Sequence, residues 1–140
     1  MQWFIFALLS AAFAALTSIL AKIGIKDINS NLATAIRTSV ILIFTWGIVI
    51  GQKNLHQIAN ISKHSLLFLV LSGIATGLSW LFYFRALQIG EASKVVPIDK
   101  LSLIITMVFA AIFLKEQFTI YSAIGAVMMT AGALIIAFAK

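Results

Sequence analysis

The chain has 140 residues, of which 62% are hydrophobic and 10% charged, and its mean hydropathy is +1.10. About a quarter of the residues of a soluble domain are charged, so this composition excludes a soluble protein and predicts an integral membrane protein. The net charge of +6 does not indicate nucleic-acid binding, because the basic residues lie mostly at the ends of apolar runs, without interleaved aromatic residues.

Five apolar segments have the roughly 20 residues that a helix needs to cross a bilayer. The first segment starts at Trp3 and looks like a secretory signal, but no basic residue precedes it, so we expect a retained span. Lipid admits only helices and closed barrels, and these runs are too long for barrel strands. We therefore predict an all-α fold, a polytopic membrane protein whose single domain over residues 1–140 is a bundle of five transmembrane helices. In chain order, the predicted helices are approximately 3–23, 32–50, 65–89, 95–114 and 118–139.

Basic residues are distributed over both ends of the predicted bundle. Three lie on the side of the N-terminus and seven on the other side, but only four of those seven lie in loops or tails. The positive-inside bias is therefore weak, and we expect insertion in both orientations, in a bacterial or archaeal cytoplasmic membrane. The two groups are Lys53, Lys63 and Lys115, and Lys22, Lys26, Arg37, Arg85, Lys94, Lys100 and Lys140.

Small or hydroxylated side chains follow one face on each of four predicted helices, at about 100° of rotation per residue, such as Thr34, Thr38 and Thr45 on the helix at 32–50. Two interpretations remain open. The faces serve close helix packing, with hydroxyls bonded across the contact or to their own backbone, or they line a shared polar cavity. The second interpretation makes them a candidate substrate-binding site. Its predicted members are Arg37 and Thr38, then Ser72, Thr76, Ser79, Trp80 and Tyr83, and finally Asp99, Ser102 and Thr106.

Two of these residues, Arg37 and Asp99, carry charge inside predicted spans. They lie toward the same side of the membrane, so we expect that they can pair, which would lower the cost of burying each charge. Asp99 also suits the first turn of a helix, where the helix dipole favours an acidic side chain. Pro97 fits the same turn, because proline has no backbone N–H and the N–H groups of a first turn have no partner within the helix. Lys100 is expected to point about 100° away from Asp99. Arg85 lies near the end of its helix and is expected to extend to the lipid headgroups.

Small residues at helical spacing predict two faces for close packing between helices or between two copies of the chain. The helix at 118–139 carries Ser122, Gly125, Met129 and Gly132 at intervals of three and four residues. The helix at 65–89 carries Gly73 and Gly77 in a G-x-x-x-G pattern, which is common in membrane spans.

No set of residues indicates catalysis, a metal or a cofactor. The chain has no cysteine, and its histidines, His56 and His64, lie in one loop where solvation is the expected state. No nucleophile accompanies a base, and no carboxylate pair has metal-binding spacing. We therefore predict a protein that is not an enzyme, with no metal and no cofactor.

Several short motifs resemble the EamA domain of the drug/metabolite transporter superfamily over nearly the whole chain. They are "AKIGIK" at 21–26, Arg37, "ALQIGEAS" at 86–93, "FLKE" at 113–116, and the pair Gly125 and Gly132. The chain departs from the family pattern at Lys115, where a glycine is usual. It also lacks the glutamate that small multidrug resistance exporters carry in their first helix, so proton antiport of that kind is not implied.

The resemblance implies a transporter. Typical members have ten helices in two inverted five-helix repeats around a central cavity, and carry amino acids, metabolites, nucleotide sugars or drugs. This sequence holds one repeat, so we expect a homodimer, antiparallel if the chain inserts both ways, that binds a small solute between the copies within membrane lipid. Two alternatives remain: an accessory or scaffold subunit that transports nothing, and a component of a lipid-linked-sugar flippase.

Overall fold

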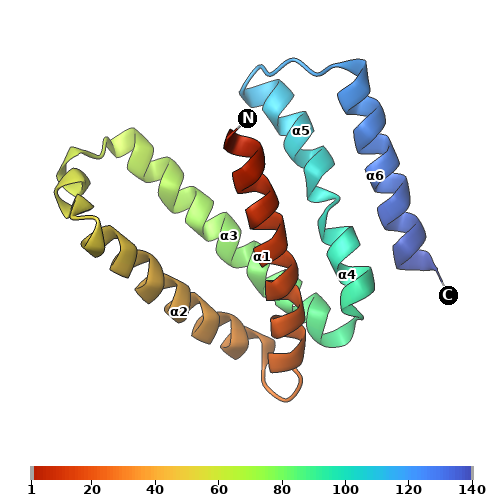
Figure 1. Cartoon of the computed structure of the whole chain (residues 1–140), viewed down its shortest axis with the longest axis horizontal. Helices are drawn as coiled ribbons and strands as arrows, with labels where there is room; N and C mark the ends of the chain where they lie inside the picture. The colour runs from red at the N-terminus through yellow and green to blue at the C-terminus, as the bar shows by residue number, and fades with distance from the viewer. Residues whose placement is uncertain (1, 140) are drawn as a thin grey trace. The chain divides into compact units, whose positions relative to one another are not determined.

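A computed structural model describes residues 2–139 of the chain, and Lys140, counted above among the basic residues, lies outside them. The described chain is helical (Figure 1). The elements in order are α1 (Gln2–Gly24), α2 (Ser30–Gly51), the 3₁₀-helix η1 (Asn54–Asn60), α3 (Lys63–Ile89), α4 (Ala92–Asp99), α5 (Ser102–Phe113) and α6 (Ile120–Phe138).

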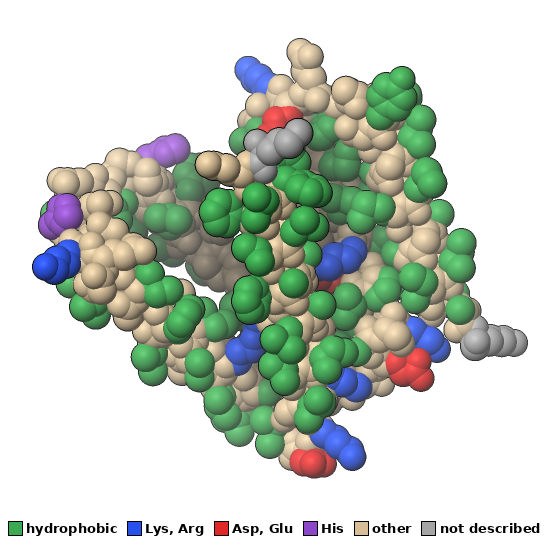
Figure 2. Space-filling model, viewed as in Figure 1, with side chains coloured by type: hydrophobic (Ala, Val, Ile, Leu, Met, Phe, Trp, Pro, Cys, Tyr) green, Lys and Arg blue, Asp and Glu red, His purple; other side chains and the backbone are tan. Residues whose placement is uncertain are grey.

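The five predicted spans are confirmed, because five helical segments in residues 2–139 are long and apolar enough to cross a membrane. Most large apolar side chains lie exposed on the helices, such as Phe82 at 74% and Ile43 at 73%. Figure 2 shows these hydrophobic side chains over every part of the face in view, with charged side chains confined to small groups. Such a surface is stable in lipid, where apolar side chains need no cover.

The fourth span differs from the single helix predicted at 95–114. It starts earlier, at Ala92, and breaks into α4 and α5 at Lys100 and Leu101. Pro97 was expected to start the helix, but it lies inside α4, at the sixth of eight residues. It cannot donate to the carbonyl of Ser93, so one bond of the helical ladder is missing there. The predicted start at residue 95 was wrong because the sequence pattern placed Pro97 in the first turn of the helix. The residues before position 95 carried no strong apolar signal.

Polar side chains mark where three of the helices begin. Asn29 accepts hydrogen bonds from the backbone of Asn31, at 2.8 Å, and of Leu32, at 3.3 Å, before α2. Thr119 accepts from the backbone of Ser122 at 3.2 Å before α6. Ser62 accepts from the backbone of Ser65 at 3.0 Å at the start of α3. These bonds satisfy N–H groups that have no partner in the first turn of a helix.

The contacts divide the chain into two compact units. The α2–α3 unit is Ile23–Gln88, and its buried apolar residues include Ile25, Phe84 and Leu87, each no more than 2% exposed. The side-chain amide of Gln88 donates to the carbonyl of Ile28 at 2.8 Å, and thereby ties the loop between α1 and α2 to the end of α3. This unit therefore has large buried side chains and a fixed loop.

The α4–α6 unit contains the chain up to Lys22 and from Ile89 onward. Within it, α4 packs against α6, and the residues of α6 that this packing buries are small, Ala126 and Ala133. Lys22 donates to the carbonyl of Gly90 at 2.6 Å and so holds the start of α4 near the end of α1. The packing of this unit relies on small side chains and short approaches between helices.

Candidate functional site

The guanidinium of Arg37 is the centre of the candidate site in the α2–α3 unit. Its carbon lies 4.5 Å from the ring centroid of Trp80 and 5.0 Å from that of Phe84, so α3 presents two aromatic rings to one cation of α2. Arg37 and Trp80 are half-buried and Phe84 is buried. Tyr83 joins the cluster through an edge-to-face contact with Phe84 at 6.2 Å. Each cation–π contact of this kind stabilises by about 0.5–2 kcal/mol, the larger value when water is excluded.

The guanidinium keeps its hydrogen-bonding capacity. Within residues 2–139, the side chain of Arg37 takes part in no hydrogen bond and no ion pair. Both of its aromatic contacts are cation–π contacts, which occupy none of its five N–H donors with a hydrogen bond. A half-buried cation in a span with unused donors suits a carboxylate or phosphate, which guanidinium binds with two parallel hydrogen bonds.

Several hydroxyls of the predicted polar faces bond to their own helix. Thr38 donates to the carbonyl of Thr34 at 2.8 Å, Thr34 to that of Ser30 at 2.9 Å, and Thr76 to that of Ser72 at 2.9 Å. This is one of the two roles expected for these residues, since a hydroxyl satisfied by the preceding turn can lie in an apolar environment. Each hydroxyl oxygen still has a free lone pair that can accept a bond.

The remaining predicted members of the polar faces are exposed. Ser72 and Ser79 lie on the exposed surface of α3, and Ser102 and Thr106 on that of α5. Among residues 2–139, the side chains of these four residues take part in no hydrogen bond, although the backbone carbonyl of Ser72 accepts one from Thr76. Their role as substrate contacts stays a prediction.

The fourth span is interrupted where the charged residues Asp99 and Lys100 lie. Four backbone bonds around the break span three residues in place of four, at 3.0–3.1 Å. They run from Lys100 to Pro97, Leu101 to Ile98, Leu103 to Lys100 and Ile104 to Leu101. Such a 3₁₀ stretch inside a helix often marks a hinge. Within a membrane, broken helices are tolerated where protein or water covers the backbone, and transporters use them to bind solutes.

Lys100 pairs with its neighbour at this break. Its ammonium nitrogen lies 3.3 Å from a carboxylate oxygen of Asp99, and both side chains are partly exposed. Lys100 was expected to point away from Asp99 and instead pairs with it. Its backbone is still right-handed helical, and its long, flexible side chain reaches back to the neighbouring carboxylate. The pairing of Asp99 with Arg37 stays a prediction, because the two residues belong to different units.

The predicted small-residue faces lie free within the subunit. A Cβ added at Gly73, Gly77, Gly125 or Gly132 would meet no side chain and no other helix within 4 Å. Ser122 and Met129 are exposed, and Gly132 is half-buried. In α6, the residues buried within the chain are instead Ala126 and Ala133, each one position after a predicted glycine. Packing of the glycine faces against a second copy stays a prediction.

Three further residues take roles that the sequence did not assign. Phe84 was missed as a partner of Arg37, although its i+4 spacing from Trp80 places both rings on one side of α3. Arg85 is exposed, and its guanidinium also donates to the side chain of Gln88 at 2.8 Å, which links it to the tethered loop. The His56 ring contacts the carbonyl of Lys53 at 3.0 Å, within its own loop.

Comparisons with known proteins agree with the resemblance noted in the sequence. The model of the EamA-like transporter family matches residues 1–138. A Sinorhizobium protein named "Uncharacterized transporter in cobO 3'region" is 47% identical over 136 residues, which cover 97% of this chain and 96% of that protein. No solved structure matches. With five apolar helices that can cross a membrane, the chain belongs to the EamA-like transporter family and is an integral membrane transporter.

Proposed function

We propose that this transporter carries a small solute with an anionic or zwitterionic group, and that it works as an antiparallel homodimer by alternating access. Its membrane is the cytoplasmic membrane of a bacterium or archaeon. The observation that carries the proposal is Arg37, a cation at the eighth of the 22 residues of α2, which lies over the rings of Trp80 and Phe84 with its donors unused. A charge inside a membrane span is expensive and usually marks a substrate pathway.

The chemistry of the cluster supports an anionic group on the solute. A carboxylate or phosphate can accept two parallel hydrogen bonds from Arg37 while the rings of Trp80 and Phe84 hold the guanidinium in a fixed plane. The hydroxyls of Thr34 and Thr38, on the same face of α2, keep a lone pair for a donor of the solute. A zwitterion such as an amino acid matches both features.

The broken fourth span supports alternating access. The 3₁₀ stretch between Pro97 and Ile104 lets α4 and α5 change their relative angle with the loss of few bonds. In transporters, such discontinuous helices lie near the midplane, beside the solute. The pairing of Asp99 with Lys100 at this break lowers the cost of placing each charge in the span and supplies charges of both signs.

The proposal of two copies rests on the size of the chain. Typical family members combine two five-helix repeats, whereas residues 2–139 of this chain hold five spans. The Sinorhizobium relative, matched over 96% of its own length, likewise has room for one repeat. Two copies would supply both walls of a midplane cavity.

Flux into liposomes tests the solute and the role of Arg37 together. Purified protein is reconstituted and offered labelled amino acids, dicarboxylates, phosphorylated sugars and organic cations. We expect uptake of an anionic or zwitterionic member, and a decrease of about a hundredfold for Arg37→Gln, the loss expected for a charged, doubly hydrogen-bonded contact. Arg85→Gln is the matched control, since Arg85 is also an arginine in a span but lies exposed. Transport of the organic cations only would contradict the proposal. So would a flux for Arg37→Gln that equals the flux of the natural protein.

Cysteine labelling tests the antiparallel arrangement. The natural chain has no cysteine, so Asp27→Cys and Asn60→Cys each introduce one reactive thiol at an exposed loop position. We expect an impermeant reagent to label about half of the copies from each side of intact vesicles at both positions, as equal insertion in two orientations requires. Labelling of each position from one side only would exclude the antiparallel dimer. A strict monomer without flux would favour the scaffold alternative.

A further inference from the structure

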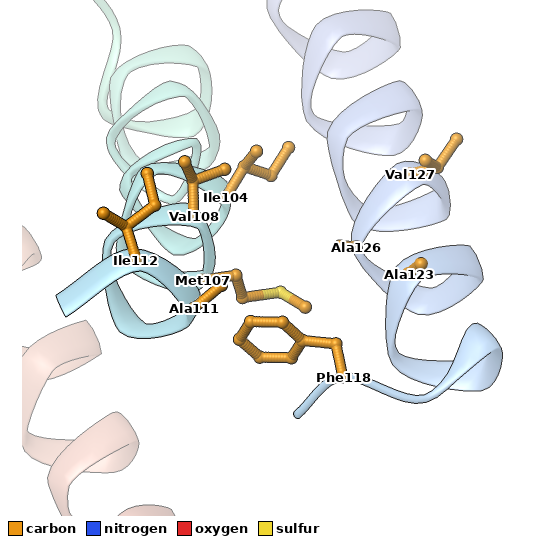
Figure 3. A pocket seen from close by; sticks show the side chains of 9 residues that line it. All are labelled: Ile104, Met107, Val108, Ala111, Ile112, Phe118, Ala123, Ala126 and Val127. Carbon is orange, nitrogen blue, oxygen red and sulfur yellow. The ribbon is translucent and has the colours of Figure 1, made fainter. Parts of the chain in front are cut away.

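An apolar groove runs between α5 and α6 in the α4–α6 unit. Its volume is about 370 Å³, and all of its lining side chains are apolar. Figure 3 shows the Met107 side chain of α5 and the Phe118 ring of the linker close together in the gap between the two helices, with Ile112 and Val127 at its outer edges. Val127 and Ile112 at the edges are 67% and 63% exposed, so the groove is open along its side. The lining residues are Ile104, Met107, Val108, Ala111, Ile112, Phe118, Ala123, Ala126 and Val127.

The groove is nearly as long as one leaflet of the hydrocarbon core is thick. It starts at Phe118, beside the linker between α5 and α6, and reaches Ile104 on α5. From Ile112 to Ile104 the helix rises by about 12 Å, at about 1.5 Å per residue. Half of the hydrocarbon core measures about 15 Å. An acyl chain that enters beside the linker would therefore fill the groove along most of its length.

The linker that contributes Phe118 to the groove also carries two charges. Lys115 and Glu116 follow the end of α5 directly, and both are exposed. Within residues 2–139, neither side chain takes part in an ion pair or a side-chain hydrogen bond. The backbone N–H of Glu116 donates to the carbonyl of Ala110 at 3.2 Å, which fixes the linker against the end of α5.

The backbone at Lys115 suggests that its side chain is needed there. Its φ of 55° lies in the left-handed region, where a residue with a side chain pays roughly 1–2 kcal/mol that glycine does not. Strain of this kind persists where surrounding structure or function requires the residue. A lysine at this position places an ammonium group at headgroup level beside the groove, next to the carboxylate of Glu116.

We propose that the groove binds one acyl chain of a phosphatidylethanolamine molecule, and that Lys115 and Glu116 bind its headgroup. The phosphate of this lipid is complementary to the Lys115 ammonium, and its primary ammonium is complementary to the Glu116 carboxylate. A helix of a second copy is a poorer occupant. Helices are about 10 Å wide, and α5 and α6 still contact each other directly.

Native mass spectrometry of the whole protein tests this site. The detergent-solubilised protein is titrated with phosphatidylethanolamine, phosphatidylcholine or phosphatidylglycerol of equal chain length. We expect preferential retention of one phosphatidylethanolamine, since phosphatidylcholine cannot donate hydrogen bonds to Glu116 and phosphatidylglycerol lacks the ammonium. Lys115→Gln and Glu116→Gln should each weaken its binding about fivefold, the effect of one charge near a membrane surface.

Two further variants separate the groove from the surface charge. Ala111→Phe fills the groove and should lower retention at least as much as Lys115→Gln, with the headgroup residues intact. Lys53→Gln is the matched control, because Lys53 is also exposed and also has a left-handed φ, of 57°, but lies in the other unit. Equal retention of the three lipids, or equal loss in Lys53→Gln and Lys115→Gln, would overturn the proposal. Should Ala111→Phe fail to fold, the two linker variants still decide it.

Discussion

The two units of this transporter are stabilised in different ways. The α2–α3 unit buries large side chains, Phe84 and Leu87 at 2% and 0% exposed, and stacks a cation on aromatic rings from another helix. The α4–α6 unit buries alanines, contains the broken fourth span and leaves a groove open between α5 and α6. The difference lies in the size of the buried side chains and in the continuity of the helices. Under the proposed function, the first unit recognises the solute and the second contains the parts that move.

The charged residues of the two units also differ in how they are held. Arg37 lies in a continuous helix, and its partners, Trp80 and Phe84, are more than 40 residues away in the chain. Lys100 lies where a helix is interrupted, and its partner is its sequence neighbour, Asp99. A charge held by distant rings restrains two helices at once, whereas a charge held by its neighbour leaves its helix free to bend.

The largest expected effect comes from the core of the α2–α3 unit. Phe84→Ala removes a ring that is 2% exposed and stacked on Arg37, and should lower the free energy of unfolding by about 3 kcal/mol. Phe82→Ala is the matched control, because Phe82 is two residues away on α3 but 74% exposed. Equilibrium unfolding in mixed micelles measures both. Equal losses in the two variants would remove the contrast between the units.

A smaller effect on stability, but a clear one on transport, is expected at the break. Asp99→Asn removes the partner of Lys100 and should lower flux roughly fivefold, the equivalent of about 1 kcal/mol in the barrier. Unfolding should change by no more than about 1 kcal/mol, because both side chains are partly exposed.

Glu91→Gln is the control for the break. Glu91 forms the other described ion pair, with Lys94 at 3.4 Å, but it precedes the start of α4, away from the break. The flux of the Glu91→Gln variant should equal that of the natural protein. Unchanged flux in Asp99→Asn would reduce Asp99 to a structural residue of α4.

The smallest effect on the fold is expected on the free face of α6. Gly125→Leu adds a side chain whose Cβ meets no side chain and no other helix within 4 Å, so the folded subunit should keep its stability. If a second copy packs on this face, the variant should weaken dimerisation about tenfold, because close approach of helices needs small residues. Ile124→Leu, on the adjacent exposed position, is the control. Crosslinking at increasing dilution in detergent measures the dimer, and equal dimer fractions would place the contact elsewhere.

The sequence alone determined the membrane class, the family and the approximate limits of the spans. Apolar runs such as 3–23 and 32–50 predict α1 and α2 to within two residues, because lipid allows a chain segment few alternatives to a continuous helix. Arg37 and Trp80 were also predicted as site residues, since charged and aromatic side chains at helical spacing stand out in an apolar segment.

Only the tertiary structure decided which residues meet. Hydropathy is the same for a straight and a broken helix, so it did not reveal the interruption after Asp99 or the pairing of Lys100. Helical spacing places residues on a face but does not say which face meets a neighbour. It therefore favoured Gly125 and Gly132 for packing, while the subunit buries Ala126 and Ala133. Contacts between helices depend on side-chain fit across distant segments, and a local pattern carries no information about that fit.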